Sequence, residues 1–337
     1  MTGAVCHLNK PNARMAGSDI AVGVIGYRNH AGRLIDLVDD YSGAQVGAVY
    51  HPHTLPPHLK GTSDFEALLA MDAIMIASPN STHAGYLNRL HSAYGGYLFC
   101  EKPVVTHRDE FEHLRVHPDR TFFNFNYRFS RFAECVRTSI DDRTLGTPIQ
   151  FSACTTQGLA FKPGYEETWR ADAARHLNGI AETKAIHQVD LAIELFGHPV
   201  SFDFQPLKVS GVGTAHDTCR IAMQCERGTY VDILASYAAP LTTHMLGSNG
   251  VIEYRDRVLR LFSPRDTFDE RGYFAAPPET VLHDFREQTA DLYADSLKRA
   301  VSYFLDTCRK QASFPEAQFD ASMETTRQML RLGKPSS

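Results

Sequence analysis

The stretch "DIAVGVIGYRNHAGRLIDLVDDY", residues 19–41, sets the fold class. It begins with a β-branched apolar run, Ile20 to Ile25, which is typical of a buried strand. A glycine-containing turn follows, and Leu34, Leu37 and Val38 then recur at helical spacing. A strand, a tight turn and an amphipathic helix in this order predict one β-α unit.

The same pattern repeats through the first half of the chain. A short helix is predicted at "SDFEALLAM" (63–71), capped by Ser63 or Asp64, and a longer one after the turn 78–81, capped by Ser81 or Thr82. Because alternating strands and helices require crossover connections, we expect a parallel sheet covered on both faces. Further strands are predicted in "AQVGAVYHP" (44–52), "DAIMIASP" (72–79), "GGYLFCEKPVV" (95–105) and "TFFNFNYRF" (121–129).

The pattern changes after about Phe132. A connecting helix, "RFAECVRTSID", is followed by segments that alternate apolar and polar residues, and helices are expected only near 179–197 and 285–310. This predicts a second domain built on a mostly antiparallel sheet. We therefore expect a flexible tail over 1–18, a first domain over 19–130 and a second domain over 131–337.

Composition excludes several classes of protein. The chain of 337 residues has a net charge of -5 and scattered basic residues, which argues against a nucleic-acid partner. No apolar run approaches the roughly 20 residues of a membrane span, so no membrane partner is expected. Seven dispersed cysteines without a CxxC pair argue against a zinc site, and no other metal site is expected. These features predict a cytoplasmic protein with reduced thiols.

Charged residues follow a strand that is otherwise apolar. In "YLFCEKPVV", Glu101 and Lys102 end a run that suits a buried strand, and unpaired buried charge is costly. Parallel sheets bind ligands at the carboxyl ends of their strands. We therefore expect one crevice to collect the polar residues that follow these ends, which are Gly26 to His30, His51, Ser78 to His83, Glu101, Lys102, Tyr127 and Arg128.

The turn "GVIGYRNHAG" partly matches a dinucleotide fingerprint, G-x-G-x-x-G. Gly26 is in place, but Arg28 occupies the position of the second glycine and Ala31 that of the third. Either the loop presents backbone N–H groups and a cation to an anionic ligand, or it is an ordinary turn with a surface arginine. An acid after the second strand would indicate NAD, but His51 stands there, so the choice between NAD and NADP stays open.

Taken together with the segment "EKPVV", these features make the chain resemble the Gfo/Idh/MocA family of NAD(P)-dependent oxidoreductases. The resemblance implies an N-terminal Rossmann domain and a C-terminal α/β domain whose open-faced sheet often mediates dimers or tetramers. It implies hydride transfer between NAD or NADP and a carbinol or keto carbon of a sugar, cyclitol or nucleotide-linked sugar. The segments that match in order are "VGVIGYRNHAGR", "DAIMIASPNSTHAGY", "LFCEKPVV", "NYRFS", "WR", "HQVDLAIELFG" and "GSNGVIEY".

The resemblance also assigns the catalytic residues. Lys102 takes the role of the family lysine that contacts the reacting hydroxyl and the nicotinamide ribose. His187, in "TKAIHQVD", matches the family histidine, but Thr183 replaces the aspartate that precedes it by four residues. A cis bond before Pro103 is expected on the same ground.

Residue chemistry supports His187 because an alcohol must lose a proton as hydride leaves, and imidazole titrates near neutrality. On a helix, Thr183, His187 and Asp190 share one face, which is either catalytic or merely solvated. The only tryptophan, Trp169, is either a sugar-stacking residue or a core residue. Candidate substrate-binding residues are Thr183, Asp190, Tyr127, Arg128, Trp169 and Arg170, with His176 a weaker one. Candidate cofactor-binding residues are Gly26, Tyr27, Arg28, Asn29, His30, His51, Ser78, Pro79, Asn80, His83, Glu101 and Lys102.

Two functions remain in competition, with a weaker third: a sugar oxidoreductase that recycles a tightly held cofactor without releasing it. A dehydrogenase of sugars or polyols is the first, and its partner in solution is expected to be a second copy of the chain, as a homodimer or homotetramer through the C-terminal sheet. A non-catalytic protein that senses a cofactor or sugar on the same fold is the alternative, because Thr183 and Arg28 depart from the enzymes' pattern.

Overall fold

The computed structural model describes residues 19–53, 55, 58–156, 159–174, 178–265, 267–289 and 291–331, so the tail predicted for 1–18 lies outside the described residues. Two compact units share them. The first comprises the residues up to Asn124 together with Lys298–Met323, and the second comprises Phe125–Leu297 and the residues from Glu324 onwards. The predicted functional boundary at residue 130 stays a prediction.

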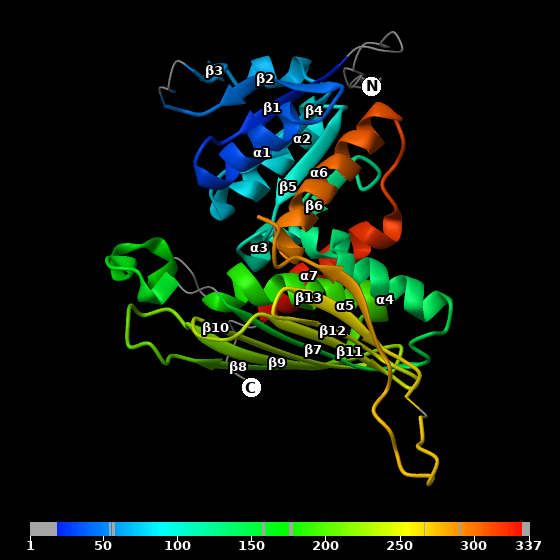
Figure 1. Ribbon diagram of the computed structural model, residues 1–337. Helices are drawn as coiled ribbons and strands as arrows, with labels where there is room; N and C mark the ends of the chain where they lie inside the picture. Colours follow the sequence, from blue (N-terminus) through cyan, green and yellow to red (C-terminus); the bar gives the residue numbers. More distant parts are fainter. Residues whose placement is uncertain are drawn as a thin grey trace, which may run out of the picture. The chain divides into compact units, whose positions relative to one another are not determined.

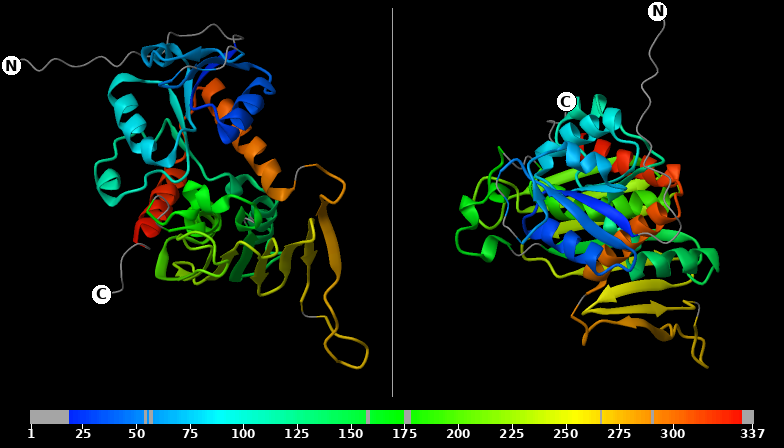
Figure 2. Two further views of the ribbon diagram at one scale, coloured as in Figure 1. Left: turned by 90° about the vertical axis from the view of Figure 1, so that its left-hand side faces the viewer. Right: turned by 90° about the horizontal axis from the view of Figure 1, so that it is seen from above.

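The first unit is built on a parallel sheet in the order β3-β2-β1-β4-β5-β6. Figure 2 (left) shows α1 and α2 on opposite faces of this sheet. Val22, Val24, Ile74 and Ile76 are buried from both sides, as their uninterrupted apolar runs predict. The doubly wound parallel sheet is therefore confirmed. Its elements are β1 (Ile20–Ile25), α1 (Asn29–Asp39), β2 (Ala44–Tyr50), β3 (Gly61–Thr62), β4 (Ala73–Ile76), α2 (His83–Ala93), β5 (Tyr97–Glu101), α3 (Arg108–Glu112) and β6 (Thr121–Asn124).

Three local predictions in this unit need correction. The strand predicted over 121–129 ends at Asn124, and a 3₁₀ helix, Asn126–Phe129, follows it. The helix in 63–71 is a 3₁₀ helix, Glu66–Ala70, although Asp64 does accept a hydrogen bond from the Glu66 N–H at its start. The N-cap of α2 is Thr82, whose hydroxyl bonds to the Pro79 carbonyl and caps no helical N–H group.

The second unit is built on a mixed sheet in the order β14-β13-β12-β11-β7-β10-β9-β8. Only β7 and β10 pair in parallel, so the mostly antiparallel sheet is confirmed. Figure 1 shows α4 and α5 on one face, while the opposite face carries no helix of the described chain. The strands are β7 (Pro148–Thr156), β8 (Pro199–Leu207), β9 (Thr218–Cys225), β10 (Tyr230–Ser236), β11 (Thr242–Gly247), β12 (Val251–Arg255), β13 (Val258–Phe262) and β14 (Glu279–Asp284).

The helices of the second half are α4 (Arg131–Asp141), α5 (Ile186–Phe196), α6 (Leu292–Arg309) and α7 (Glu316–Arg331). The expectation of helices only near 179–197 and 285–310 is wrong, because α7 follows them. The division into units falls within both α6 and α7. None of the helices described is both long and apolar enough to cross a bilayer. A cytoplasmic location stays a prediction.

The turn after β1 yields a matched pair of glycine variants. Gly26 has φ +106°, and a Cβ there would lie 2.8 Å from the Ala77 carbonyl oxygen. We expect Gly26→Ala to lower the free energy of unfolding by about 1–3 kcal/mol. A Cβ added to Gly32, inside α1, would meet no atom within 4 Å, so Gly32→Ala should raise it by up to about 1 kcal/mol. Urea unfolding of both variants measures this, and equal effects would contradict it.

Candidate functional site

The carboxyl ends of three neighbouring strands meet in the first unit. Ile25 of β1 pairs with Ile76 of β4, and Ile76 pairs with Cys100 of β5. Gly26, Ala77 and Glu101 therefore follow one another along a single sheet edge. The strand order reverses between β1 and β4, which is where open parallel sheets bind their ligands.

Helix α1 begins at this edge with the features of an anion site. Its N-cap residue, Arg28, makes no side-chain capping bond, and its first turn contains no acid. The first N–H groups of a helix lack intrahelical partners, and the helix dipole favours negative charge beside them. Gly26 brings the chain into the turn at φ +106°. The residues present therefore fit the pyrophosphate of a dinucleotide.

The buried acid at the end of β5 has two partners. Glu101 is 7% exposed, and its Oε1 accepts hydrogen bonds from His30 Nε2 at 2.7 Å and from Asn124 Nδ2 at 2.6 Å. His30 lies in the first turn of α1, and Asn124 ends β6. Glu101 thus joins a helix and two strands, which explains how a charged residue can end a buried strand.

Charge and burial act in opposite directions on this pair. Burial alone would raise the pKa of Glu101, but the His30 charge and the two hydrogen bonds outweigh it and hold this pKa below its ordinary range. The Glu101 charge raises the pKa of His30 against the opposing effect of burial. Both shifts favour the ionised pair.

His83 anchors the segment that carries Lys102. It is wholly buried, with Nδ1 2.8 Å from the Pro103 carbonyl oxygen and Nε2 3.1 Å from that of Ser78. Burial lowers its pKa. Because both ring nitrogens face protein carbonyls, the predicted direct contact of His83 with the cofactor lacks a polar atom to make it. His83 instead ties α2 to the ends of β4 and β5.

The remaining predicted cofactor residues lie around the same edge. Lys102 is half-buried, and the bond between Lys102 and Pro103 is cis, as predicted. Ser78 Oγ lies 2.7 Å from Thr82 Oγ1 in the turn after β4. Contacts of Lys102 and Ser78 with a cofactor stay predictions. Of the others, Arg28, Asn29 and Pro79 are exposed, and Tyr27, His51 and Asn80 are half-buried.

In the second unit, α5 is almost entirely buried. The prediction that α5 has an exposed polar face is wrong, because His187 is 8% exposed and Asp190 is 0% exposed. A π-helix, Ala181–Ala185, precedes α5, so the 3.6-residue spacing used to align Thr183 with His187 does not apply there. Thr183 Oγ1 lies 3.5 Å from the Ile180 carbonyl oxygen.

Asp190 forms a bidentate ion pair with Arg128. The two Asp190 oxygens accept bonds of 2.6 Å and 2.5 Å from Arg128 Nε and Nη2, and Thr325 Oγ1 donates to Oδ1 at 3.1 Å. Burial raises the pKa of Asp190 to about 6 against the effect of the Arg128 charge. With Arg128 3% exposed, the pair is interior. A direct substrate contact predicted for either residue is replaced by a positioning role, in which the pair holds the segment 125–130 against α5.

His187 belongs to a stack of three rings. The ring centroids of His187 and Tyr127 lie 4.4 Å apart. The ring centroids of Tyr127 and Tyr293 lie 3.9 Å apart. The Tyr293 hydroxyl accepts a 3.0 Å hydrogen bond from Gln188 Nε2 and lies 2.7 Å from Thr243 Oγ1. Burial raises the pKa of Tyr127 well above its ordinary value, so its ring is neutral. The stack holds the imidazole plane of His187 in one orientation.

The other predicted residues are less constrained. The Arg170 guanidinium lies 4.4 Å over the Trp169 ring, and both are half-buried, so Trp169 is not a core residue. His176 lies outside the described residues. Within the described part of the chain, no group of three or more His, Cys, Asp or Glu side chains is arranged to hold a metal ion.

Sequence reasoning missed three supporting residues. Asn124 had a signal, because it interrupts the aromatic run "TFFNFNYRF". Tyr293 and Thr325 had none, since Tyr293 meets Gln188, and Thr325 meets Asp190, across more than 100 residues of chain.

Two family models match this chain over most of its folded length. Residues 20–118 match the model described as the oxidoreductase family with an NAD-binding Rossmann fold, and residues 134–253 match the Gfo/Idh/MocA C-terminal domain. The chain belongs to the Gfo/Idh/MocA family. It is an oxidoreductase whose cofactor is NAD or NADP, as predicted.

Relatives of known name agree with this assignment. The inositol 2-dehydrogenase of Rhizobium meliloti (strain 1021) is 28% identical over 251 residues, covering 70% of this chain and 71% of that protein. The solved structure of myo-inositol 2-dehydrogenase from Lactobacillus plantarum has a TM-score of 0.70 at 17% identity, covering 94% of this chain and 98% of that one. Levoglucosan dehydrogenase in its apo form has a TM-score of 0.77 at 16% identity, covering 94% and 96%. At these identities the two structures show the shared fold.

The Glu101 network predicts a shift that NMR can read. Glu101→Gln keeps the shape of the side chain but removes the charge that raises the pKa of His30. The pKa of His30 should therefore fall, measured by a pH titration of its imidazole resonances. Glu112→Gln, at an exposed acid of α3, is the control and should leave the His30 titration unchanged. An unaltered His30 titration in Glu101→Gln would contradict the network.

The interior ion pair predicts a large effect on stability. Asp190→Asn leaves Arg128 buried without its counter-charge, so the free energy of unfolding should fall by about 3–5 kcal/mol. Glu66→Gln breaks the solvent-exposed pair of Glu66 with Arg89 and should cost no more than about 1 kcal/mol. Urea unfolding of both variants compares them, and a small loss for Asp190→Asn would show that the interior charges are not coupled.

Proposed function

We propose that the protein is a dehydrogenase that transfers hydride between NAD(P) and a carbinol or keto carbon of a sugar, cyclitol or nucleotide-linked sugar. The observation that carries the proposal is Lys102, placed by the anchored Glu101 and Pro103 at the carboxyl edge of the dinucleotide sheet. Relatives named as inositol and levoglucosan dehydrogenases support this substrate class and favour an enzyme over a sensing protein. Residues 19–130 would bind the dinucleotide, and 131–337 the substrate.

Lys102 would act on the reacting oxygen. When bound, the nicotinamide accepts or donates the hydride. As hydride leaves an alcohol carbon, negative charge develops on its oxygen, and a compact ammonium with three donors stabilises that charge where water is excluded. The segment from Glu101 to Pro103 is anchored on both sides of Lys102, so the lysine backbone needs no reordering during the reaction.

His187 would carry the proton. Imidazole changes its protonation near neutrality, so it can accept the hydroxyl proton on oxidation and return it on reduction. The ring stack with Tyr127 keeps this imidazole in one plane. The family aspartate would normally assist it, and Thr183, which replaces it here, supplies a hydroxyl that can hydrogen-bond but cannot carry charge.

The proposal predicts the loss of turnover in two variants. Lys102→Ala and His187→Asn should each lower kcat by at least about 100-fold, because each removes a group that acts on the reacting hydroxyl. The measurement is nicotinamide absorbance during incubation with a panel of polyols and keto-sugars. Lys162→Ala, at an exposed position, is the control and should retain activity. A fully active His187→Asn would assign proton transfer to another group.

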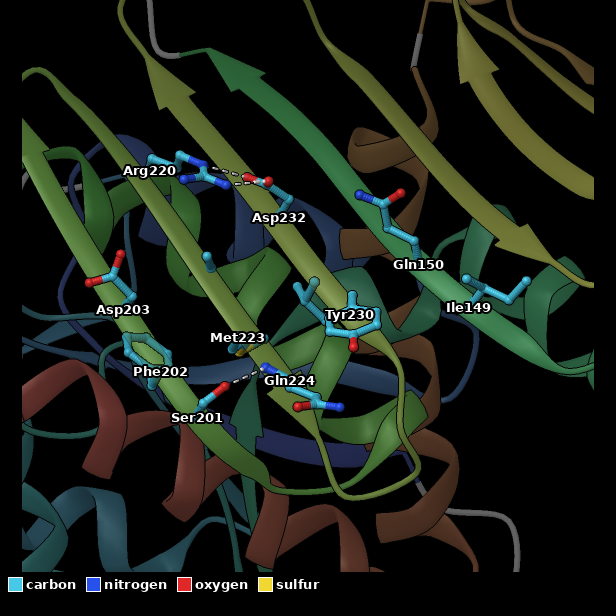
Figure 3. Close-up of a pocket in the computed structure, with 12 residues that line it drawn as sticks. Ile149, Gln150, Ser201, Phe202, Asp203, Arg220, Met223, Gln224, Tyr230 and Asp232 are labelled. Atoms are coloured by element: carbon cyan, nitrogen blue, oxygen red, sulfur yellow. Dashed lines mark hydrogen bonds and ion pairs between the residues drawn. The ribbon is translucent and has the colours of Figure 1, made fainter.

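We further propose that the open face of the second sheet binds a second copy of the chain, giving a homodimer or homotetramer. The face carries a groove of about 560 Å³ lined by residues of β7, β8, β9 and β10, among them the paired Arg220 and Asp232 (Figure 3). Tyr230 and Leu234 lie on β10 within this face. The large apolar side chains that are exposed in the described chain all belong to the second unit: Ile149, Phe161, Val200, Leu207, Val209, Tyr230, Leu234, Phe268, Tyr273, Phe274 and Val281.

This assembly is tested by placing charge on the sheet. A stable interface buries roughly 800 Å² on each partner, so two charges at its centre should disrupt it. Tyr230→Asp with Leu234→Asp should convert the assembly to monomers in size-exclusion chromatography with light scattering. Arg115→Asp, at an exposed position of the first unit, is the control. A wild-type chain that is itself monomeric at micromolar concentration would refute the assembly.

A further inference from the structure

The two stretches of sequence that form the turn after β1 and follow the end of β2 are rich in hydrogen-bond donors and contain no acid. From His51 to Ser63 the sequence "HPHTLPPHLKGTS" has no aspartate or glutamate, and neither has "GYRNHAGRLI", residues 26–35. In parallel-sheet dinucleotide domains, an acid after the second strand accepts hydrogen bonds from the ribose of NAD. No residue in these two stretches can supply that carboxylate.

His51 presents a donor just after the end of β2. The His53 backbone N–H donates to His51 Nδ1 at 3.1 Å, so the proton of the neutral ring lies on Nε2. Burial, the neighbouring His53 and Arg28 lower the pKa of His51, which favours this neutral form. The Tyr27 ring packs edge-on against the imidazole with centroids 4.7 Å apart. His51 therefore offers Nε2–H in a fixed direction.

Arg28 supplies a permanent positive charge beside His51. It is the N-cap residue of α1, its side chain is exposed, and it directly follows Tyr27, whose ring contacts that of His51. Among the described acids, none forms an ion pair with it within 4 Å. A guanidinium presents a planar fork of donors that matches two oxygens of a phosphate.

We propose that Arg28 and His51 bind the 2′-phosphate of the adenosine ribose, so that the enzyme prefers NADP(H) to NAD(H). This inference rests on the proposed dehydrogenase function. A ribose 2′-hydroxyl both donates and accepts, and the Arg28 guanidinium and His51 Nε2–H supply no acceptor for its proton, which the usual acid would take. A 2′-phosphate only accepts, and its two negative charges complement the cation. An acid at the position of His51 would favour the ribose of NAD, whereas the donors of Arg28 and His51 match a 2′-phosphate.

Binding measurements test the preference without turnover. Isothermal titration calorimetry of the full chain with NADP⁺ and NAD⁺ should give a dissociation constant at least about tenfold lower for NADP⁺, and 2′,5′-ADP should bind more tightly than 5′-ADP. Because the discriminating contact is ionic, the preference should shrink as salt is raised from about 50 to about 500 mM.

Variants separate the effect of Arg28 and His51 from general electrostatics. Arg28→Gln should weaken NADP⁺ binding at least about tenfold more than it weakens NAD⁺ binding. Arg115→Gln removes the same charge from another exposed position of the first unit and should leave both unchanged. His51→Asp places an acceptor after β2 and should shift the ratio of dissociation constants towards NAD⁺.

The outcomes distinguish this inference from the proposal on which it rests. If NAD⁺ binds as tightly as NADP⁺ or more tightly, or if Arg28→Gln weakens both equally, the 2′-phosphate site is wrong and the dehydrogenase stands. If neither dinucleotide binds, the dehydrogenase proposal itself fails.

Discussion

The buried carboxylate of Glu101 is the interaction on which the first unit's site depends. One oxygen accepts hydrogen bonds from the first turn of α1 and from the end of β6 while its own residue ends β5. A buried charge is tolerated only when it is paired and hydrogen-bonded, so the acid holds these elements in one arrangement or destabilises all of them. Because Lys102 directly follows Glu101, the same hydrogen bonds fix the position of the Lys102 backbone.

Buried paired groups also fix the position of α5 in the second unit. Arg128 and Asp190 satisfy each other in the interior, and the neighbouring residues Tyr127 and His187 stack on each other. Two consecutive residues of the 3₁₀ helix Asn126–Phe129 thus fix two positions of α5, one by charge and one by ring contact. Interior pairs of this kind contribute little net stability but penalise alternative packings, so this pair favours one arrangement of α5.

The two faces of the second sheet have different roles. Helix α5 and its buried polar groups occupy one face, where packing leaves little freedom (Figure 1). The other face is open, and exposed apolar side chains gather on it and on the segment between β13 and β14. A face of this kind favours a partner that covers it, because large exposed apolar area otherwise promotes aggregation. The helix proposed to carry the proton-transfer residue and the face proposed for assembly therefore lie on opposite sides of the second sheet.

Local sequence was enough to specify the parallel sheet, the glycine turn, the strand that ends at Glu101 just before Lys102, and the family, because these depend on periodicity and on residues adjacent in the chain. It could not show that Glu101 meets His30 and Asn124, that Asp190 is interior, or that Tyr293 supports the stack on His187. Those facts depend on contacts between residues far apart in the chain. A helical face drawn at 3.6 residues per turn also failed at the π-helix before α5, since the backbone there follows tertiary packing rather than propensity.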